Sequence, residues 1–307
     1  MTDTKATLGL TTTSQRGCSI LEVLSFKNFD LLKRKNEVKL HLGENLSLLI
    51  STSGSTGSSK LVRISNENLE ENTKSIVKYL KILETDVILL PEMFNTSFCP
   101  KSIHLAETMD GKTVSWMKEI SKNKNCAIAG SLMIKGNGKV YNRLVWISKN
   151  GIIKTYDKHH LFSLIKEEET IAKGEGRLIV EIEGWKICPL ICYDLRFPVF
   201  SRNNVDYDIL IYLANWPVKR IDAWDTLLKA RAIENQCYTI GVNRVGEDGN
   251  GVSFNGHTKV FDAFGKELFS ASENKEEVLQ IEISLDDLKL KRRQMNFLQD
   301  KDDFTLL

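Results

Sequence analysis

The stretch Lys186-Ile-Cys-Pro-Leu-Ile-Cys-Tyr-Asp-Leu-Arg-Phe-Pro198 changes character at its centre. An apolar run ends at Cys192, a polar segment follows, and Pro198 suits the first position of a helix. This order predicts a strand that ends at a thiol and then turns into a helix. A thiol in that position faces a cleft, where backbone N–H groups can bind an oxyanion. A buried, inert cysteine is the alternative, and for a cysteine taken alone it is the ordinary one.

Two further strand ends each carry one charged residue after an apolar run. Asp86-Val-Ile-Leu-Leu-Pro-Glu92 ends in a carboxylate, and Gly151-Ile-Ile-Lys-Thr-Tyr-Asp-Lys158 ends in a lysine. A solvated charge is the ordinary interpretation of either one alone. Together with Cys192 they make a chemical set, because a thiol needs a base and a tetrahedral oxyanion needs a fixed cation. The sequence therefore predicts a Glu–Lys–Cys catalytic site.

Composition excludes several classes of protein. The 307 residues include 42 Lys and Arg against 40 Asp and Glu, a net charge of +2, which gives no footprint for nucleic acid or an anionic membrane. The hydrophobic share of 42% and the charged share of 27% are those of a globular protein. No apolar run is long enough to span a bilayer, and the first residues do not resemble a secretory signal.

The cysteines indicate a free thiol rather than a disulfide or metal framework. Six cysteines in a chain of this length are too few for a disulfide scaffold, so we expect a cytoplasmic protein. Cys188 and Cys192 share a strand face, but a Cys-x3-Cys pair without further Cys or His ligands is a poor metal site. We expect no metal, and we expect Cys126 and Cys188 to be buried and inert.

Short apolar strands dominate the chain from Asp86 onward. We expect strands at 86–91, 126–133, 142–148, 151–157, 178–191 (split by Gly184 into a hairpin), 208–215, 238–245, 258–264 and 278–284. Helices are expected at 113–122, 223–236 and 285–294. Many strands between few long helices favour an α/β sandwich of sheets flanked by helices.

Three motifs carry a resemblance to a known family: LPEMF (90–94), YDKHHLF (156–162) and ICYDLRFP (191–198). They resemble the nitrilase, or carbon–nitrogen hydrolase, superfamily over about residues 83–307. Further matches, such as Asn215-Trp-Pro217, look most like its bacterial omega-amidase branch. The resemblance implies a four-layer αββα sandwich, a homodimer and no cofactor. It also implies hydrolysis of a small-molecule amide, the terminal amide of 2-oxoglutaramate or 2-oxosuccinamate, through a cysteine thioester.

The resemblance implies roles for individual residues. Glu92 is implied as the general base, Lys158 as the cation that holds the oxyanion, and Cys192 as the nucleophile. Glu167, nine residues after Lys158 in an acidic run, matches the family's second glutamate, which positions the lysine and the hydrolytic water. A solvated acidic face is the alternative for that run. The backbone N–H of Tyr193 is implied as the second oxyanion donor.

Substrate recognition is predicted close to the nucleophile. Arg196 lies four residues after Cys192 and can bind a carboxylate through two hydrogen bonds, or it can brace the following turn. Phe98 and Trp216 are candidates for the walls of a small pocket, and core packing is the alternative for both.

The chain departs from the family before residue 83. Residues 26–80 resemble a fragment of an adenylate-forming (acyl-AMP) ligase, with Lys60 as the implied phosphate-binding cation. Ser59 stands where that family has proline, so we expect no working adenylation site. We expect residues 1–60 to form an N-terminal extension and residues 61–307 to form the hydrolase domain. In that domain, a strand at 61–64 and a helix at 68–81 would replace the family's first strand and helix.

Two alternatives to an omega-amidase stay open. One is another short-chain aliphatic amidase of the same superfamily. The other is a non-catalytic fusion chain in which a disturbed first sheet misplaces the Glu–Lys–Cys set.

Overall fold

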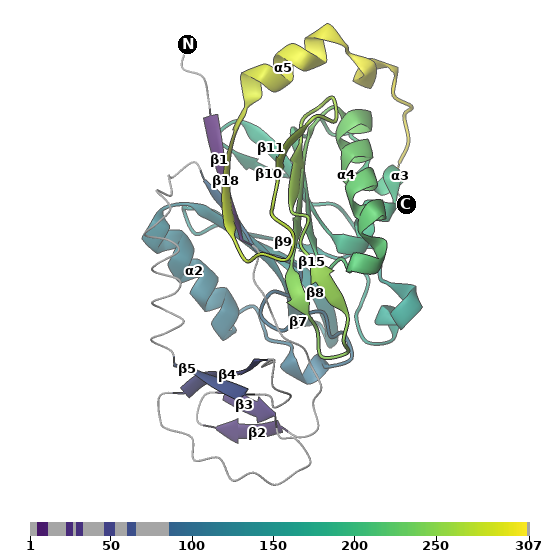
Figure 1. Ribbon diagram of the computed structural model, residues 1–307. Helices are drawn as coiled ribbons and strands as arrows, with labels where there is room; N and C mark the ends of the chain where they lie inside the picture. Colours follow the sequence, from purple (N-terminus) through teal and green to yellow (C-terminus); the bar gives the residue numbers. More distant parts are fainter. Residues whose placement is uncertain are drawn as a thin grey trace. The chain divides into compact units, whose positions relative to one another are not determined.

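The computed structural model describes residues 5–11, 23–26, 29–32, 46–52, 60–65 and 86–305 (Figure 1). The chain falls into two compact units. The larger unit runs over Met1–Gln15, Ile82–Gly246 and Val252–Leu307, and the smaller one over Arg16–Lys81 and Glu247–Gly251. The site described below lies in the larger unit.

The first of two six-stranded sheets has the strand order β18-β1-β6-β7-β8-β9. Its strands are β18 (Val278–Ser284), β1 (Lys5–Thr11), β6 (Val87–Leu89), β7 (Ala127–Gly136), β8 (Lys139–Ile147) and β9 (Ile153–Asp157). β1, β6 and β7 are parallel to one another, and the remaining pairings are antiparallel. Helix α2 (Lys112–Lys124) packs on β7 and β8.

The second sheet has the order β10-β11-β12-β13-β16-β17. Its strands are β10 (Val180–Ile182), β11 (Trp185–Ile191), β12 (Ile209–Ala214), β13 (Tyr238–Asn243), β16 (Lys259–Phe261) and β17 (Glu267–Ser270). β11, β12 and β13 are parallel, and helix α4 (Ile221–Asn235) packs on β13. Glu183 and Gly184 both have positive φ and form the tight turn of the β10–β11 hairpin.

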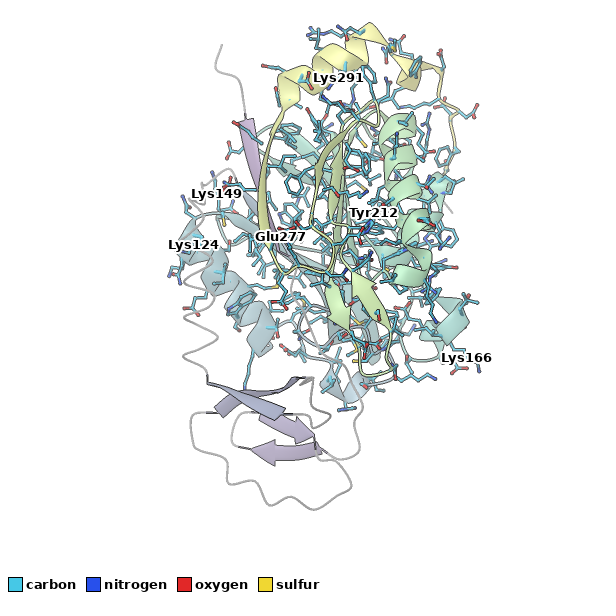
Figure 2. The ribbon with its side chains drawn as sticks, viewed as in Figure 1. Lys124, Lys149, Lys166, Tyr212, Glu277 and Lys291 are labelled. Atoms are coloured by element: carbon cyan, nitrogen blue, oxygen red, sulfur yellow. The ribbon has the colours of Figure 1, made fainter. Side chains whose placement is uncertain are left out.

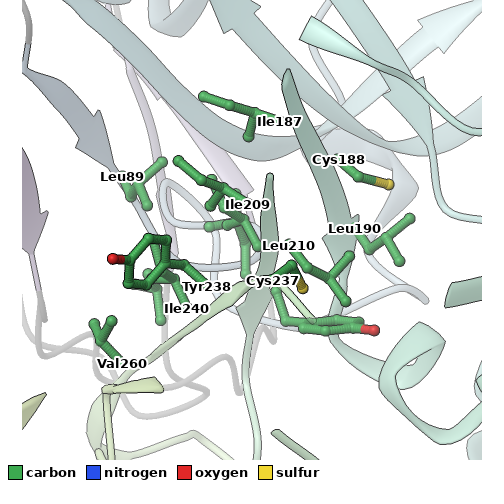
Figure 3. Packing of buried hydrophobic residues seen from close by; sticks show 14 of the residues in the cluster. Leu89, Ile187, Cys188, Leu190, Ile209, Leu210, Cys237, Tyr238, Ile240 and Val260 are labelled. Carbon is green, nitrogen blue, oxygen red and sulfur yellow. The ribbon is translucent and has the colours of Figure 1, made fainter. Parts of the chain in front are cut away.

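The two sheets face each other across one apolar core (Figure 3). Successive residues of a strand point to opposite faces, and β6 shows this directly. Val87 and Leu89 belong to the cluster that also contains Leu190 and Leu213 of the second sheet. Ile88 belongs to a separate cluster with residues of α2. With α2 and α4 on opposite sides of the sheets (Figure 1), the order is helix, sheet, sheet, helix, which confirms the predicted αββα sandwich.

Smaller elements complete the described chain. They are the hairpin β14–β15 (Val245–Glu247, Ser253–Asn255), α3 (Pro198–Ser201), α5 (Leu285–Gln294), and the 3₁₀ turns η1 (Ile103–Leu105), η2 (Ser163–Ile165), η3 (Glu167–Glu169), η4 (Cys192–Arg196), η5 (Val218–Arg220) and η6 (Phe297–Asp300). The lysine side chains labelled in Figure 2 lie toward the outside of the molecule. Tyr212 lies in the interior, whereas Lys124, Lys149 and Lys166 lie at the periphery (Figure 2).

The strand beside β6 differs from the one expected. β1 occupies that position, with Leu8 opposite Val87, and on its other edge it pairs with β18. Residues 61–64 do form a strand, β5 (Lys60–Ser65), but it pairs with β4 (Leu46–Thr52) in the smaller unit. Pairing with a strand nearby in sequence closes only a short loop, which costs little entropy. The helix expected at 68–81 lies outside the described residues.

The smaller unit contains two antiparallel pairs. β2 (Val23–Phe26) pairs with β3 (Phe29–Leu32), and β4 pairs with β5, where Lys60 lies opposite Thr52. Residues 53–59 of the phosphate-loop-like segment lie outside the described residues.

Candidate active site

Strand ends bring the predicted catalytic residues together. Glu92 follows β6, Lys158 follows β9 directly, and Cys192 follows β11 directly. Glu167 comes from the turn η3. Because β6 and β9 belong to one sheet and β11 to the other, the cluster lies where strand ends of both sheets meet.

The ammonium group of Lys158 lies between two carboxylates. Its Nζ is 3.0 Å from Oε1 of Glu92, and it is 2.9 and 3.1 Å from the two oxygens of Glu167. All three side chains are fully buried. Buried charges of this kind persist only when they are paired and hydrogen-bonded. The cluster is therefore a built feature of the fold, and the alternative of a solvated acidic face for Glu167 is excluded.

Further donors fix the orientation of the Glu92 carboxylate. Oε1 also accepts a hydrogen bond from Asn142 Nδ2 at 2.8 Å, and Oε2 accepts one from the backbone N–H of Asn215 at 3.0 Å. The Asn215 side chain returns to donate to the carbonyl of Glu92 at 2.6 Å. Asn142 is itself held by the hydroxyl of Ser131. Glu92 is thus held on three sides, and its remaining contact is with the thiol.

Cys192 presents its thiol to Glu92. Sγ lies 4.0 Å from the carbonyl oxygen of Asn215, whose backbone N–H binds Glu92, and the Glu92 carboxylate is near enough to raise the pKa of the thiol. Cys192 keeps some solvent exposure, whereas Cys126, Cys188 and Cys237 are buried. Its backbone has φ 43°, a left-handed conformation that costs energy in a residue other than glycine and that concentrates at functional sites. This strained turn directs the thiol out of the end of the strand.

The electrostatics favour a protonated thiol beside a charged lysine. Burial raises the pKa of Cys192 well above its usual value, Glu92 raises it further, and Lys158 opposes both. Burial alone would lower the pKa of Lys158, but the carboxylates of Glu167 and Glu92 outweigh it, and the net pKa is raised. Burial raises the pKa of Glu167 as well, against the effect of Lys158. The resting site therefore holds a neutral thiol, so its proton has to leave during the reaction.

The other cysteines behave as expected. Burial raises the pKa of Cys188 to about 12 and that of Cys126 to about 11, so neither thiol ionises readily at neutral pH. Both belong to the packed apolar clusters. Their interpretation as structural residues is confirmed.

A buried network braces the turn that carries Cys192. Asp194 is completely buried and accepts four hydrogen bonds, two on each oxygen. Oδ2 binds the hydroxyl of Tyr156 at 2.7 Å and the N–H of Ile191 at 3.0 Å. Oδ1 binds the N–H of His160 at 3.0 Å and its Nδ1 at 2.9 Å. The network ties the loop after Lys158 to the turn at Cys192.

The predicted substrate-binding residues form two cation–ring contacts. Arg196 places its guanidinium carbon 4.9 Å from the ring centroid of Trp216, and the ammonium of Lys158 lies 4.9 Å from that of Phe98. Asp194, and not Arg196, forms the side-chain hydrogen bond that holds the turn after Cys192. Among the described residues the Arg196 side chain forms no hydrogen bond or ion pair with another residue; its contact is with the Trp216 ring. Tyr193 is the second residue of η4, so its N–H lies in the first turn, where a helix supplies no partner.

Sequence reasoning missed several residues of the site. Asn142 and Asn215, which hold Glu92, and Arg220 in η5 were not predicted. Within the described residues, no group of three or more His, Cys, Asp or Glu side chains is arranged to hold a metal ion. No helix in that part of the chain is long and apolar enough to cross a membrane.

Comparison with known proteins decides the family. The sequence model of the carbon-nitrogen hydrolase family matches residues 60–293, three quarters of the chain. The chain belongs to the carbon-nitrogen hydrolase family. Strand β1 lies outside the matched range, although it completes the first sheet of this hydrolase fold.

Named relatives of this carbon-nitrogen hydrolase include two amidases. The omega-amidase YafV of Yersinia enterocolitica is 41% identical over 74% of this chain and 88% of its own length. The 2-oxoglutaramate amidase of Bacillus subtilis is 35% identical over 72% of this chain and 85% of its own.

A solved structure also matches. The crystal structure of a CN-hydrolase superfamily protein from Xanthomonas campestris has a TM-score of 0.79 and 32% identity, and the match covers 99% of this chain and all of that one. The resemblance of residues 26–80 to an adenylate-forming ligase finds no support in these comparisons.

Proposed function

We propose that this carbon-nitrogen hydrolase is an omega-amidase, which hydrolyses the terminal amide of small 2-oxo dicarboxylic acid monoamides such as 2-oxoglutaramate and 2-oxosuccinamate. The observation that carries the proposal is the buried Glu92–Lys158–Glu167 cluster in contact with the thiol of Cys192. The names of two relatives, an omega-amidase and a 2-oxoglutaramate amidase, give the substrate class.

The first half of the reaction forms a thioester. Glu92, the carboxylate that acts on the Cys192 thiol, takes its proton while sulfur attacks the amide carbon. The carbonyl oxygen becomes an oxyanion, held by the ammonium of Lys158 and the N–H of Tyr193. When the carbon–nitrogen bond breaks, Glu92 returns the proton to the leaving nitrogen, and ammonia departs.

The second half hydrolyses the thioester. Glu92 takes a proton from water, the resulting hydroxide attacks the thioester carbon, and Lys158 again holds the oxyanion. The carbon–sulfur bond breaks, and the proton returns from Glu92 to sulfur, so the resting thiol is restored. Glu167 bonds Lys158 throughout through both oxygens, which positions the ammonium without needing to accept a proton.

The far end of the substrate is assigned to Arg196. Its guanidinium has no protein carboxylate among the described residues, and it lies over Trp216 close to the nucleophile. An arginine in that state suits a carboxylate ligand. Phe98 and Trp216 would line the short passage between the carboxylate and the amide.

Ammonia release from a panel of amides tests the function. Wild-type protein should hydrolyse 2-oxoglutaramate much faster than butyramide, and Cys192→Ala should abolish both activities. Cys188→Ala is the matched control, because it removes a thiol from the same strand without touching the site. Butyramide turnover that matches 2-oxoglutaramate would favour the short-chain aliphatic amidase. An inactive wild type would favour the non-catalytic fusion chain. A homodimer and a cytoplasmic location stay predictions.

A further inference from the structure

A second arginine stands beside the site without a protein partner for its charge. Arg220 ends the turn η5 and immediately precedes helix α4. Its side chain is exposed, and its guanidinium carbon lies 5.2 Å from the ring centroid of Phe162. Within the described part of the chain, neither Arg220 nor Arg196 forms an ion pair with a carboxylate. An exposed arginine is common on protein surfaces, so the place where this one is held decides its role.

The backbone of Arg220 is fixed to the catalytic cluster. Asn215, which donates to Glu92, begins the segment that ends at Arg220. In between, the Trp216 indole N–H donates to the carbonyl of Arg220 at 2.7 Å, and the Arg220 N–H donates to the carbonyl of Pro217 at 3.0 Å. Asn243 holds the backbone of Trp216 through two further bonds. The guanidinium therefore leaves a rigid turn at a set place relative to Glu92.

Ring contacts join Arg220 to the residues around the thiol. Phe162, under the Arg220 guanidinium, packs against the ring of Tyr193 at 5.0 Å, and Tyr193 directly follows Cys192. On the other side, Trp216 lies under Arg196. Both guanidiniums thus rest on aromatic rings tied to the site: Phe162 contacts Tyr193, the residue after Cys192, and Trp216 follows Asn215, whose carbonyl oxygen lies 4.0 Å from the thiol.

The charges of these groups act on one another. Burial lowers the pKa of Arg220, the Arg196 cation lowers it further, and the Cys192 thiol opposes both. Among the described residues neither guanidinium has a carboxylate partner, so the charges of both are left for an anion that the protein does not supply. An arginine pair suits a ligand with several acceptor oxygens in one plane.

We propose that Arg220 and Arg196 together form the anion subsite for the end of the substrate opposite the amide. The identity of that end as a 2-oxo carboxylate rests on the proposed function. One guanidinium binds the carboxylate, and the other reaches the remaining carboxylate oxygen and the 2-oxo group. Arg220 is then a specificity-determining residue: a neutral amide gains nothing from it.

Alkylation of Cys192 tests the subsite without any substrate. Iodoacetate and iodoacetamide react with the same thiol, but only iodoacetate carries a carboxylate. Arg220→Met keeps an unbranched side chain over Phe162 and removes the cation. It should lower the ratio of the iodoacetate rate to the iodoacetamide rate by roughly three- to tenfold, because a cation in a cleft concentrates anions. Lys219→Met is the matched control, since Lys219 is an exposed cation one residue away, and it should leave the ratio unchanged.

Steady-state kinetics then tests the substrate. For Arg220→Met, kcat/KM on 2-oxoglutaramate should fall roughly 10- to 100-fold more than on pentanamide, mostly through KM. Arg220→Lys should recover part of the loss, because it restores charge but not the two-pronged geometry.

The outcomes separate the two proposals. An unchanged alkylation ratio in Arg220→Met, or an equal fall in Lys219→Met, overturns the anion subsite. If both reagents react more slowly by the same factor, Arg220 affects the reactivity of the thiol and does not bind the carboxylate, which also overturns the anion subsite. If the ratio falls while wild-type protein shows no preference for 2-oxoglutaramate, the subsite stands and the proposed substrate is wrong.

Discussion

Asp194 offers the sharpest test of how the nucleophile turn is held. Its two oxygens accept four hydrogen bonds, and every one of the facing groups is a donor or can be one. In Asp194→Asn one oxygen becomes an amide nitrogen, which has no acceptor lone pair. The amide can adopt two orientations, and the protein will take the less costly one.

In either orientation the nitrogen faces one backbone N–H, that of Ile191 or that of His160. It also faces one group that can accept a hydrogen bond, the Tyr156 hydroxyl or Nδ1 of His160. One charge-assisted bond is then lost and the others weaken. At about 1.5–3 kcal/mol for a bond to a charged group, the free energy of unfolding should fall by about 2–3 kcal/mol.

Thermal unfolding and ammonia release together measure this effect. A loss of that size lowers Tm by about 3–5 °C in a chain of this length, because the entropy of unfolding grows with the number of residues. Turnover should fall more than stability predicts, because displacement of the turn moves the Cys192 thiol away from Glu92. Asp206→Asn is the control: Asp206 is exposed, its positive φ tolerates asparagine, and its ion-pair contact at 3.5 Å is weak. Wild-type Tm and turnover in Asp194→Asn would refute the bracing role.

Three other substitutions test the candidate site and the packing of the fold around it. Glu92→Gln should abolish amide hydrolysis, yet iodoacetamide should label Cys192 faster at pH 8. The reason is that burial and then Glu92 raise the thiol pKa, and without the Glu92 charge burial is the main cause that still raises it. Slower labelling would contradict this account. Gly241→Ala should lower stability by about 1–3 kcal/mol in urea titrations, because the added Cβ would overlap Leu228 and Trp224 of α4, whereas Gly251→Ala meets no atom and differs only by its positive φ. Burial lowers the pKa of His159 below its ordinary 6.5, so the folded state favours the neutral ring. The free energy of unfolding should therefore fall as pH drops from 7.5 to 5.5, and His159→Gln should reduce that fall. An unchanged pH dependence in His159→Gln would argue against a contribution from this histidine.

Most of the sandwich could be predicted because its strands are short apolar runs between turn residues. The hairpin at Gly184 and the helix at 285–294 occur as expected. Two strands of the six-stranded sheets were not predicted, nor were the short strands β2, β3, β14 and β15 outside them. β17 (Glu267–Ser270) lies at a sheet edge with mostly exposed side chains, so it lacks the alternation of buried residues that marks a strand. β1 lies in a stretch rich in Ser, Thr and Lys, and its place in the sheet is decided by partners far along the chain.

The candidate site also contains residues that the sequence predicts and residues that it does not. Glu92, Lys158 and Cys192 follow apolar runs, which made each visible as a charge or thiol at a strand end. Asn215 also follows an apolar strand and belongs to the Asn215-Trp-Pro217 motif, but its role in holding Glu92 was not predicted. Asn142 and Arg220 carry no comparable signal. Asn142 lies within β8 and reaches Glu92 only after the sheet has formed. Contacts that join residues 50 or more positions apart have to be read from the structure.

The charge balance of the cluster explains why it holds two glutamates for one lysine. In the proposed mechanism Glu92 and Glu167 begin as carboxylates paired with the Lys158 ammonium, so the buried set carries one net negative charge beside a neutral thiol. In the proposed attack, the proton moves from sulfur to Glu92 and the negative charge appears on the oxyanion, so the buried total does not change. Conserving it avoids the cost of burying another charge in the transition state. Glu92 is then neutral, and without Glu167 the lysine would lose its only permanent counter-ion and its fixed position. Glu167→Gln should therefore lower turnover while Cys192 still reacts with iodoacetamide, which separates the positioning of Lys158 from the chemistry of the thiol.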